Sequence, residues 1–494
     1  MLEKMDLSKR MEKETYKEKI TSLQAELGRL QRECKELKIP VMIAFEGFDA
    51  AGKGLQIGEL LQALDPRGFE VHAVKQETEE EKMYPFLWRF WTKIPEKGRI
   101  AIYDTSWYRR VLVERFEKKM SEKQLAEAFS SICSFEQQLT DDGMVLVKLF
   151  LCIDQKEQKK RLKKLLKNKE TAWRVTEADW KRNKDFSKYR AINEEMLKKT
   201  DTDYAPWMLI EATDRRFATV KIYTAVIQMM KRAVERAKAP EQSVKQKNAI
   251  AYDKDLQSSI LSKADLSLSY TKEEYKEKLR KLQDKIEKLH GELYRRRIPV
   301  VLGFEGWDAG GKGGAIKRLT QKMDPRGYVV HPTASPNDIE KAHHYLWRFW
   351  QAMPKAGHVT IFDRTWYGRV MVERIEGFCS TEEWQRAYKE INDMENDLVN
   401  AGAIVIKFWL QIDKDEQERR FTERQQNPEK QWKITDEDWR NREKWDQYEE
   451  AVNEMLIRTS TPEAPWVVVE GNNKYYARIK VLETVVKAIE ERLK

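Results

Sequence analysis

The chain has 494 residues, of which 41% are hydrophobic and 35% are charged, and its formal net charge is +10. A chain of this length exceeds what one ordinary hydrophobic core organises, so two or more domains are expected. The basic balance indicates an anionic partner, and its sign alone does not choose among nucleotides, inorganic polyanions, nucleic acid and membrane surfaces.

Cysteine usage and the start of the chain indicate a compartment. The four cysteines stand far apart, with no Cys-x-x-Cys pair, so we expect neither disulfides nor structural zinc and infer a reducing environment. The first residues run directly into mixed charge, and no segment approaches the roughly 18 consecutive apolar residues of a membrane span. These features predict a cytoplasmic protein.

The sequence contains one pattern twice. The segment Phe45–Gly54 recurs as Phe304–Gly313, so that residue 45 corresponds to residue 304, a shift of 259 positions. The same shift carries Trp88–Trp91 onto Trp347–Trp350. A polar junction near 239–243 lacks any apolar period. The repeat predicts one fold written twice.

Each copy is expected to begin with a helix, because apolar residues recur every three or four positions over 20–34 and again over 279–293. This is heptad spacing, but it lasts for only about three heptads, whereas coiled-coil pairing usually needs more. Two interpretations remain: a helix packed on its own or the sister domain, or a zipper between chains. A homo-oligomer therefore stays open.

A glycine-rich loop follows the apolar run 298–302. Segment Phe304–Gly313 leads from that strand into a helix that begins near Ala315. Such a turn directs backbone N–H groups and a helix N-terminus to one place, which suits a phosphate chain. The alternative is a turn that merely joins strand to helix.

The spacing of Gly306, Gly311 and Lys312 is that of a P-loop, or Walker A motif. The residue after the lysine is Gly313, where a P-loop carries the Ser or Thr hydroxyl that holds Mg²⁺. A metal must therefore be held by another group, and Asp308, inside the loop, is the nearest candidate.

The later elements of the second copy are expected in this order: strand Tyr328–His331, a helical segment His344–Trp350, strand His358–Phe362, helix Glu382–Asn400, strand Ala403–Leu410, the charged segment Asp415–Tyr448, strand Trp466–Glu470 and a final helix from about Tyr475. Short apolar strands that alternate with helices imply a parallel sheet covered on both faces. The predicted fold class is α/β, with two tandem doubly wound domains of the P-loop kinase kind. The aromatic cluster within His344–Trp350 either belongs to the core or stacks a base.

Several charged residues suit phosphoryl transfer, which needs positioning and positive charge. Asp363 closes an apolar strand in the manner of a Walker B carboxylate, so Asp308 and Asp363 together could hold hydrated Mg²⁺, or Mn²⁺ in its place. An aspartate at a strand end is alternatively a helix cap. Arg364 and Arg369 follow at once, and arginine forks suit phosphate oxygens, although a solvated, salt-bridged helix face is the competing interpretation.

The segment Glu418–Lys433 carries dense positive charge around an Asn-Pro break. In a kinase, a helical insertion at this place between strands can act as a lid that brings arginines over the transferred phosphate and excludes water. A charged run of this kind can also be no more than a solvated face.

These residues resemble a known family. Segments Gly306–Gly313, Phe362–Arg369, Val372–Arg374 and Lys430–Lys433 look like the motifs of the polyphosphate kinase 2 family, and the resemblance covers nearly the whole of both copies. The tandem arrangement resembles the two-domain branch of that family. The resemblance implies a polyphosphate:AMP phosphotransferase activity, in which the terminal phosphate of inorganic polyphosphate passes to AMP and gives ADP, with Mg²⁺.

The resemblance also implies roles for individual residues. Asp308 and Asp363 would bind the metal and orient the accepting phosphate, and Lys312 with Arg364 would neutralise the moving group. Contacts to phosphate or polyphosphate are implied for Gly306, Gly311, Lys312, Gly313, Arg369, Arg420 and Lys433, the last two as parts of the lid.

The first copy departs from this pattern. It keeps Asp49, Lys53 and Asp104, but Thr105 stands where the second copy has Arg364, and Leu55, where the second copy has Gly314, is expected to narrow the phosphate cradle. We therefore predict a degenerate N-terminal domain over residues 1–240, a linker over 241–262 and an active C-terminal domain over 263–494.

Two other functions compete with this interpretation. An ATP-dependent nucleoside monophosphate kinase of ordinary P-loop type is disfavoured by Gly313, which lacks the hydroxyl. A non-enzymatic polyanion-binding protein is disfavoured by the paired carboxylates Asp308 and Asp363, which repel phosphate. We expect neither nucleic acid nor a membrane as partner.

Overall fold

The computed structural model describes residues 1–117, 120–239 and 260–494, apart from the side chains of Lys433 and Glu437. Most of the predicted linker, 241–262, lies outside the described residues. The chain divides into two compact units. Of the described residues, the first unit contains 1–77, 89–117, 120–239 and 338–344, and the second contains 78–88, 260–337 and 345–494.

The first copy contains the following main elements: α1 (Lys13–Glu36), β1 (Val41–Gly47), α2 (Lys53–Leu61), β2 (Phe69–Ala73), α3 (Trp88–Trp91), β3 (Ile100–Asp104), α4 (Glu122–Asp141), β4 (Val145–Cys152), α5 (Gln155–Lys167), α6 (Glu177–Lys184), α7 (Phe186–Thr200), β5 (Trp207–Glu211) and α8 (Arg215–Lys238).

The second copy repeats these elements and has two further short helices, α11 and α13: α9 (Lys272–Arg296), β6 (Val300–Gly306), α10 (Lys312–Thr320), β7 (Tyr328–Pro332), α11 (Asp338–Lys341), α12 (Trp347–Gln351), β8 (Val359–Asp363), α13 (Val372–Ile375), α14 (Thr381–Asn400), β9 (Ile404–Gln411), α15 (Lys414–Gln426), α16 (Asp436–Glu443), α17 (Trp445–Thr459), β10 (Trp466–Glu470) and α18 (Lys474–Leu493).

Each unit is built on a five-stranded sheet. The strand order is β2-β3-β1-β4-β5 in the first and β10-β9-β6-β8-β7 in the second, which is the same order listed from the opposite edge. All the pairings between these strands are parallel, and β6 lies between β8 and β9 with Phe304 beside Asp363. The predicted doubly wound α/β fold is therefore confirmed. Because parallel strands end at one edge, the loops that follow β6 and β8 are neighbours.

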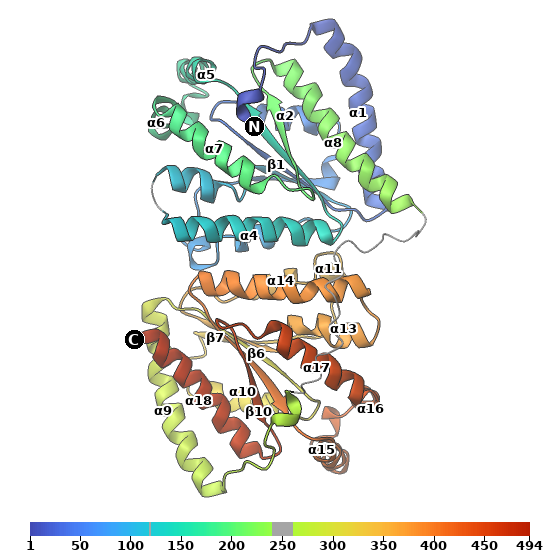
Figure 1. Cartoon of the computed structure of the whole chain (residues 1–494), viewed down its shortest axis with the longest axis vertical. Coiled ribbons are helices and arrows are strands. Elements are labelled where there is room, and N and C mark those ends of the chain that lie inside the picture. Colours follow the sequence, from blue (N-terminus) through green and yellow to red (C-terminus); the bar gives the residue numbers. More distant parts are fainter. Residues whose placement is uncertain (118–119, 240–259) are drawn as a thin grey trace. The chain divides into compact units, whose positions relative to one another are not determined.

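Helices cover both faces of each sheet. In the second unit α9, α10 and α18 pack together on one face, while α14 and α17 pack on the other (Figure 1). Helix α9 lies along α18, where Lys285 pairs with Glu490 at 2.9 Å. Helix α1 lies along α8 in the first unit in the same way. The heptad-spaced helices thus pack within their own units, because their apolar stripes face a partner helix.

The core of the second unit contains a buried ion pair. Lys407 on β9 and Glu395 on α14 are each 1% exposed, and the Lys407 ammonium lies 2.7 Å from the Glu395 carboxylate. The ammonium also donates to the hydroxyl of Tyr367, 2.9 Å away. Lys148 and Glu136 form the same pair in the first unit. The duplication therefore extends to polar contacts inside the core.

Two members of the aromatic cluster of the second copy, Phe349 and Trp350, are part of the core. Phe349 and Trp350 are 3% and 0% exposed, and the ring of Phe349 packs edge-on against Trp366 at 5.7 Å. The four cysteines are free thiols. In the part of the chain that the structure describes, no helix is both long and apolar enough to span a bilayer.

Candidate active site

The glycine loop after β6 has the backbone that its sequence predicts. Gly306 has a φ of 149°, and a Cβ placed there would come within 2.7 Å of the Leu410 carbonyl oxygen, so only glycine fits. Gly311, with a φ of 109°, forms the N-cap of α10. The Lys312 ammonium donates to the Gly306 carbonyl at 2.7 Å and so lies across the loop. This geometry leaves the first N–H groups of α10 without helical partners at the loop.

One cavity of about 100 Å³ opens beside this loop. Gly306, Asp308, Lys312 and Arg364 are among the residues that line it. The structure thus brings together four residues that the sequence predicted for one site. Lysine and arginine next to an aspartate and a helix N-terminus form an environment for phosphate with a counter-charge at hand.

Asp308 is held by partners from distant parts of the chain. One carboxylate oxygen accepts from the amide of Asn441 on α16 at 3.0 Å, and the other lies 3.4 Å from the Arg364 guanidinium. The neighbouring Trp307 stacks on Trp445 of α17, with 3.6 Å between ring centroids and 7° between planes. The glycine loop is therefore braced against the helices that follow the predicted lid.

Asp363 ends β8 beside the loop but is not among the residues that line the cavity. Gly313 faces open space, since a Cβ there would meet no atom within 4 Å. Position 313 therefore has room for a serine or threonine side chain. Steric hindrance does not explain why the hydroxyl is missing there. In the described residues, no group of three or more His, Cys, Asp or Glu side chains is arranged to hold a metal ion.

Two carboxylates next to a phosphate loop nevertheless fit Mg²⁺. This ion is usually held in kinases by one or two carboxylates, several waters and the oxygens of the substrate phosphates. Asp308 lines the cavity, and Asp363 stands on the adjacent strand. The donor set suits a hard, oxygen-seeking cation. The metal ligands stay a prediction.

Arg364 has a strained backbone. Its φ is 65°, in the left-handed region that residues with a Cβ seldom adopt, and its N–H donates to the Phe304 carbonyl at 3.0 Å. Its side chain is 54% exposed. Thr105 has the same backbone conformation in the first copy, with a φ of 64°. Strained backbone of this kind is concentrated at functional sites. The first copy therefore keeps the backbone conformation of the site but lacks the guanidinium of Arg364.

Glu305 is a site residue that sequence reasoning missed. Its carboxylate is buried, lines the cavity and accepts from both the N–H and the hydroxyl of Thr365, at 2.6 and 2.7 Å. Burial raises the pKa of Glu305, although the charge of Lys312 opposes the shift. Glu46 and Ser106 repeat the arrangement. A charged residue inside an apolar strand in both copies was the available signal.

The raised pKa of Glu305 predicts a pH-dependent effect. Because the folded protein holds this proton more tightly than the unfolded chain does, wild type should lose stability as pH rises from about 4.5 through the folded pKa, while Glu305→Gln has no such proton to release. We expect the midpoint of thermal unfolding of Glu305→Gln to rise relative to wild type above pH 4.5. Parallel profiles from pH 4 to pH 7, a range of about three units, would contradict this.

Arg369 lies apart from the cavity. Its guanidinium stacks over the ring of Tyr345 at 4.4 Å and pairs with Glu373 at 3.1 Å, and it is 14% exposed. It does not appear among the residues that line the cavity. In this structure the Arg369 guanidinium is engaged by Tyr345 and Glu373, and its contact with phosphate stays a prediction.

Arg420 is buried beneath the loop rather than exposed on a lid. It is 3% exposed, and its guanidinium donates to the carbonyls of Ala309 at 2.8 Å, Gly471 at 2.6 Å and Asn472 at 3.1 Å. Arg161 makes the same kind of contacts in the first copy. The arrangement gives Arg420 a positioning role in which it ties the glycine loop to the segment after β10.

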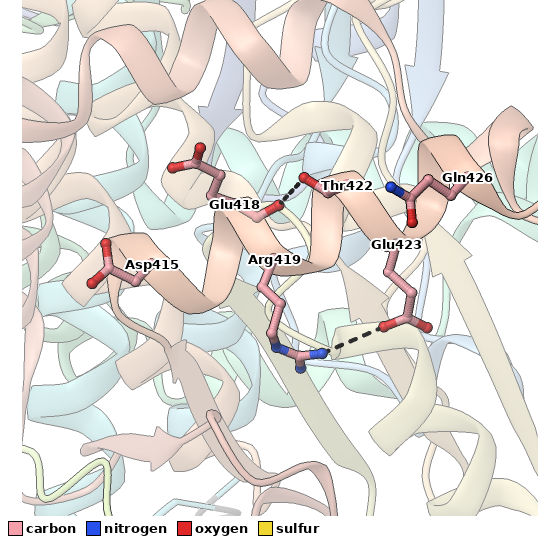
Figure 2. A pocket seen from close by; sticks show the side chains of 6 residues that line it. All are labelled: Asp415, Glu418, Arg419, Thr422, Glu423 and Gln426. Atoms are coloured by element: carbon pink, nitrogen blue, oxygen red, sulfur yellow. Dashed lines mark hydrogen bonds and ion pairs between the residues drawn. The ribbon is translucent and has the colours of Figure 1, made fainter.

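The outer face of α15 is solvated instead. Figure 2 shows the side chain of Arg419 on this face, turned toward Glu423. The Arg419 guanidinium lies 3.7 Å from the Glu423 carboxylate. Arg419 is 59% exposed and also pairs with Glu416 at 2.7 Å. The charged run is thus partly an ordinary salt-bridged surface. The side chain of Lys433, the other predicted lid residue, lies outside the described residues.

Arg420→Ala should destabilise the second unit by about 3 kcal/mol, because one buried and two partly buried carbonyls would lose a charged donor. Arg419→Ala, one residue away on the exposed face, should change stability by less than about 1 kcal/mol. Chemical unfolding of the two variants measures the difference. Equal effects would contradict the buried positioning role of Arg420.

The corresponding loop of the first unit is closed by an ion pair. The Asp49 carboxylate accepts from the Arg182 guanidinium at 2.7 and 3.2 Å. Arg182 occupies the position of Asn441, and neither residue was recognised from the sequence. The shift of 259 positions pairs Arg182 with Asn441 and could have revealed this difference. On charged helices, however, a change of this kind resembles neutral variation of a solvent-exposed surface.

The structure offers a different account of Leu55 from the predicted narrowing of the cradle. A Cβ on Gly314 would lie 3.4 Å from the Arg478 guanidinium, whereas the first copy has Thr219 in place of Arg478. Leu55 is 46% exposed. In the first copy the larger Leu55 is thus accompanied by the smaller Thr219. Leu55 therefore need not narrow the phosphate-binding loop.

Two relatives match the chain over nearly its whole length. The chain is 41% identical over 496 aligned positions to a polyphosphate:AMP phosphotransferase of Pseudomonas aeruginosa, covering 100% of this chain and 99% of the relative. It is 39% identical to a protein of the same name from Pseudomonas syringae pv. tomato, covering 99% and 98%.

A solved structure extends the likeness to three dimensions. The crystal structure of a protein assigned as polyphosphate kinase 2 from Pseudomonas aeruginosa PA01 matches with a TM-score of 0.88 and 38% identity, covering 100% of this chain and 99% of that one. The family model described as polyphosphate kinase 2 matches residues 10–238 and again 269–494. The chain therefore belongs to the polyphosphate kinase 2 family, with one copy of the family domain in each half.

Proposed function

We propose that this protein is a polyphosphate:AMP phosphotransferase whose second unit transfers the terminal phosphate of inorganic polyphosphate to AMP, giving ADP, with Mg²⁺ as cofactor. The substrates follow from full-length relatives that carry this name. The placement in the second unit is supported by one observation: Asp308, Lys312 and Arg364 line a single cavity there.

The transfer moves one phosphoryl group between two phosphate chains. An oxygen of the AMP phosphate attacks the terminal phosphorus of polyphosphate, the bridging P–O bond breaks, and the electron pair stays on the shortened polyphosphate. The attacking oxygen is already ionised at neutral pH, so no residue needs to remove a proton. Catalysis then depends on positioning and on neutralising charge.

The chain supplies both. The N–H groups at the start of α10 and the Lys312 ammonium bind phosphate oxygens at the loop. Arg364, at the mouth of the same cavity, donates to oxygens of the moving group. When bound, Mg²⁺ would supply positive charge that offsets the charge of the phosphate oxygens, and Asp308 with Asp363 would hold it. Arg420 and the stack of Trp307 on Trp445 keep the loop in place.

A donor assay tests this function. The protein is incubated with AMP, Mg²⁺ and long-chain polyphosphate in the absence of ATP, and ADP is measured by chromatography. ADP formation is the predicted result. Product that requires ATP as donor would favour an ordinary nucleoside monophosphate kinase, and binding of polyphosphate without product would favour the polyanion-binding alternative.

A further inference from the structure

Besides Arg364 and Thr105, the two units differ at a second position that touches the loop aspartate. Helix α16 places Asn441 against Asp308, while helix α6 places Arg182 against Asp49. In each unit the two partners are 133 residues apart in sequence. The strands that position the loop pair in the same register in both units, so the chain contains a natural substitution of a neutral amide by a cation next to the loop aspartate.

Arg182 places a positive charge directly against Asp49. Two of its nitrogens reach both carboxylate oxygens, at 2.7 and 3.2 Å, and it also pairs with Asp179 at 2.7 Å. Its side chain is only 9% exposed. Burial acts to lower the pKa of Arg182, but the charge and hydrogen bonding of Asp49, together with the charges of Tyr189 and Asp179, outweigh it, and the pKa is raised. A bidentate pair this well buried persists, because its removal would leave a charge without a partner.

Asn441 leaves the charge of Asp308 in place. Its amide donates one hydrogen bond, at 3.0 Å, to one carboxylate oxygen and adds no charge. Arg364 approaches the other oxygen with a single nitrogen at 3.4 Å from a side chain that is 54% exposed, where solvent weakens the attraction. The Asp308 carboxylate is therefore oriented by Asn441 while it remains able to attract a second cation.

We propose that this helix position decides which unit binds a divalent cation: Asn441 keeps Asp308 competent, and Arg182 serves as a built-in cation that takes the place of the metal at Asp49. The inference rests on the proposed function only for the identity of the ion. In this proposal Asn441 is a positioning residue. The predicted inactivity of the first unit then has a second cause, in addition to Thr105 standing in place of Arg364.

Metal-directed cleavage tests this without either substrate. Fe²⁺ replaces Mg²⁺ in carboxylate sites, and with ascorbate and peroxide it generates hydroxyl radicals that cut the backbone near the bound ion. Fragments are mapped by mass spectrometry. Wild type should be cut near Asp308 and Asp363, and uncut near Asp49 and Asp104. Asn441→Arg should lose the cuts in the second unit, and Arg182→Asn should gain cuts in the first.

Control variants separate charge from folding. Asn441→Gln keeps a neutral amide and should keep the wild-type cuts. Asn441→Arg should fold, because Asp438 stands where Asp179 supports Arg182 in the first unit, and circular dichroism checks this. Unchanged cutting in Asn441→Arg, no new cuts in Arg182→Asn, or a wild type cut equally in both units would each overturn the proposal. If the cuts follow the prediction but no ADP forms from polyphosphate, only the proposed reaction fails.

Discussion

Replacing Arg364 with threonine, the residue that the first copy carries, should lower kcat for ADP formation by about 10²–10³-fold. Arg364 lines the cavity with Lys312 and Asp308, and its backbone is held at a φ of 65°. A cation at this place acts mainly on charge that spreads over the moving phosphoryl group, so its loss should affect kcat more than KM. Steady-state kinetics with AMP and polyphosphate measure both constants.

Two matched variants complete this test. Arg364→Lys keeps a positive charge but loses the fork, and it should retain part of the activity. Thr105→Ala, at the corresponding position of the first unit, should leave kcat within about twofold, less than 1 kcal/mol in barrier. A wild-type kcat in Arg364→Thr would remove Arg364 from the mechanism.

Removing the buried cation Lys407 should destabilise the second unit by about 3–5 kcal/mol. Lys407→Met fills a similar volume but leaves Glu395 buried at 1% exposure, without its counter-charge. It also leaves the Tyr367 hydroxyl with one partner fewer. Urea or thermal unfolding followed by circular dichroism measures the loss.

The double variant Lys407→Met with Glu395→Gln separates charge from packing. Because it removes both ions of the pair, it should recover much of the stability that the single variant loses. A double variant as unstable as Lys407→Met would show that packing, rather than an unpaired charge, determines the loss. Lys148→Met should repeat the effect in the first unit, where the same pair is fully buried.

The fold could be predicted because its signals are local. Apolar runs such as Ala403–Leu410 match β9 within a residue at each end, and the repeat of 259 positions transfers each strand to the other copy. The glycine loop was equally readable, since Gly306 and Gly311 need the backbone conformations that only glycine adopts easily. Patterns of this kind depend on neighbours in sequence.

Side-chain partners that lie far apart in sequence were not readable. The sequence placed Arg420 on a lid over phosphate, whereas the fold buries it under the loop, 111 residues from its partner Ala309. Asn441 and Arg182 sit on charged helices where any polar residue satisfies the amphipathic pattern. Only the packing of α16 and α6 onto the loops distinguishes them from surface residues.

The most direct test of the whole account compares two single carboxylate variants in the same assay. ADP formation from AMP and polyphosphate is measured for Asp363→Asn and for Asp104→Asn, with thermal unfolding to confirm that both proteins fold. The account predicts that Asp363→Asn loses activity by about 10³-fold or more and that Asp104→Asn keeps it. Activity that survives in Asp363→Asn and disappears in Asp104→Asn would contradict the placement of the reaction in the second unit.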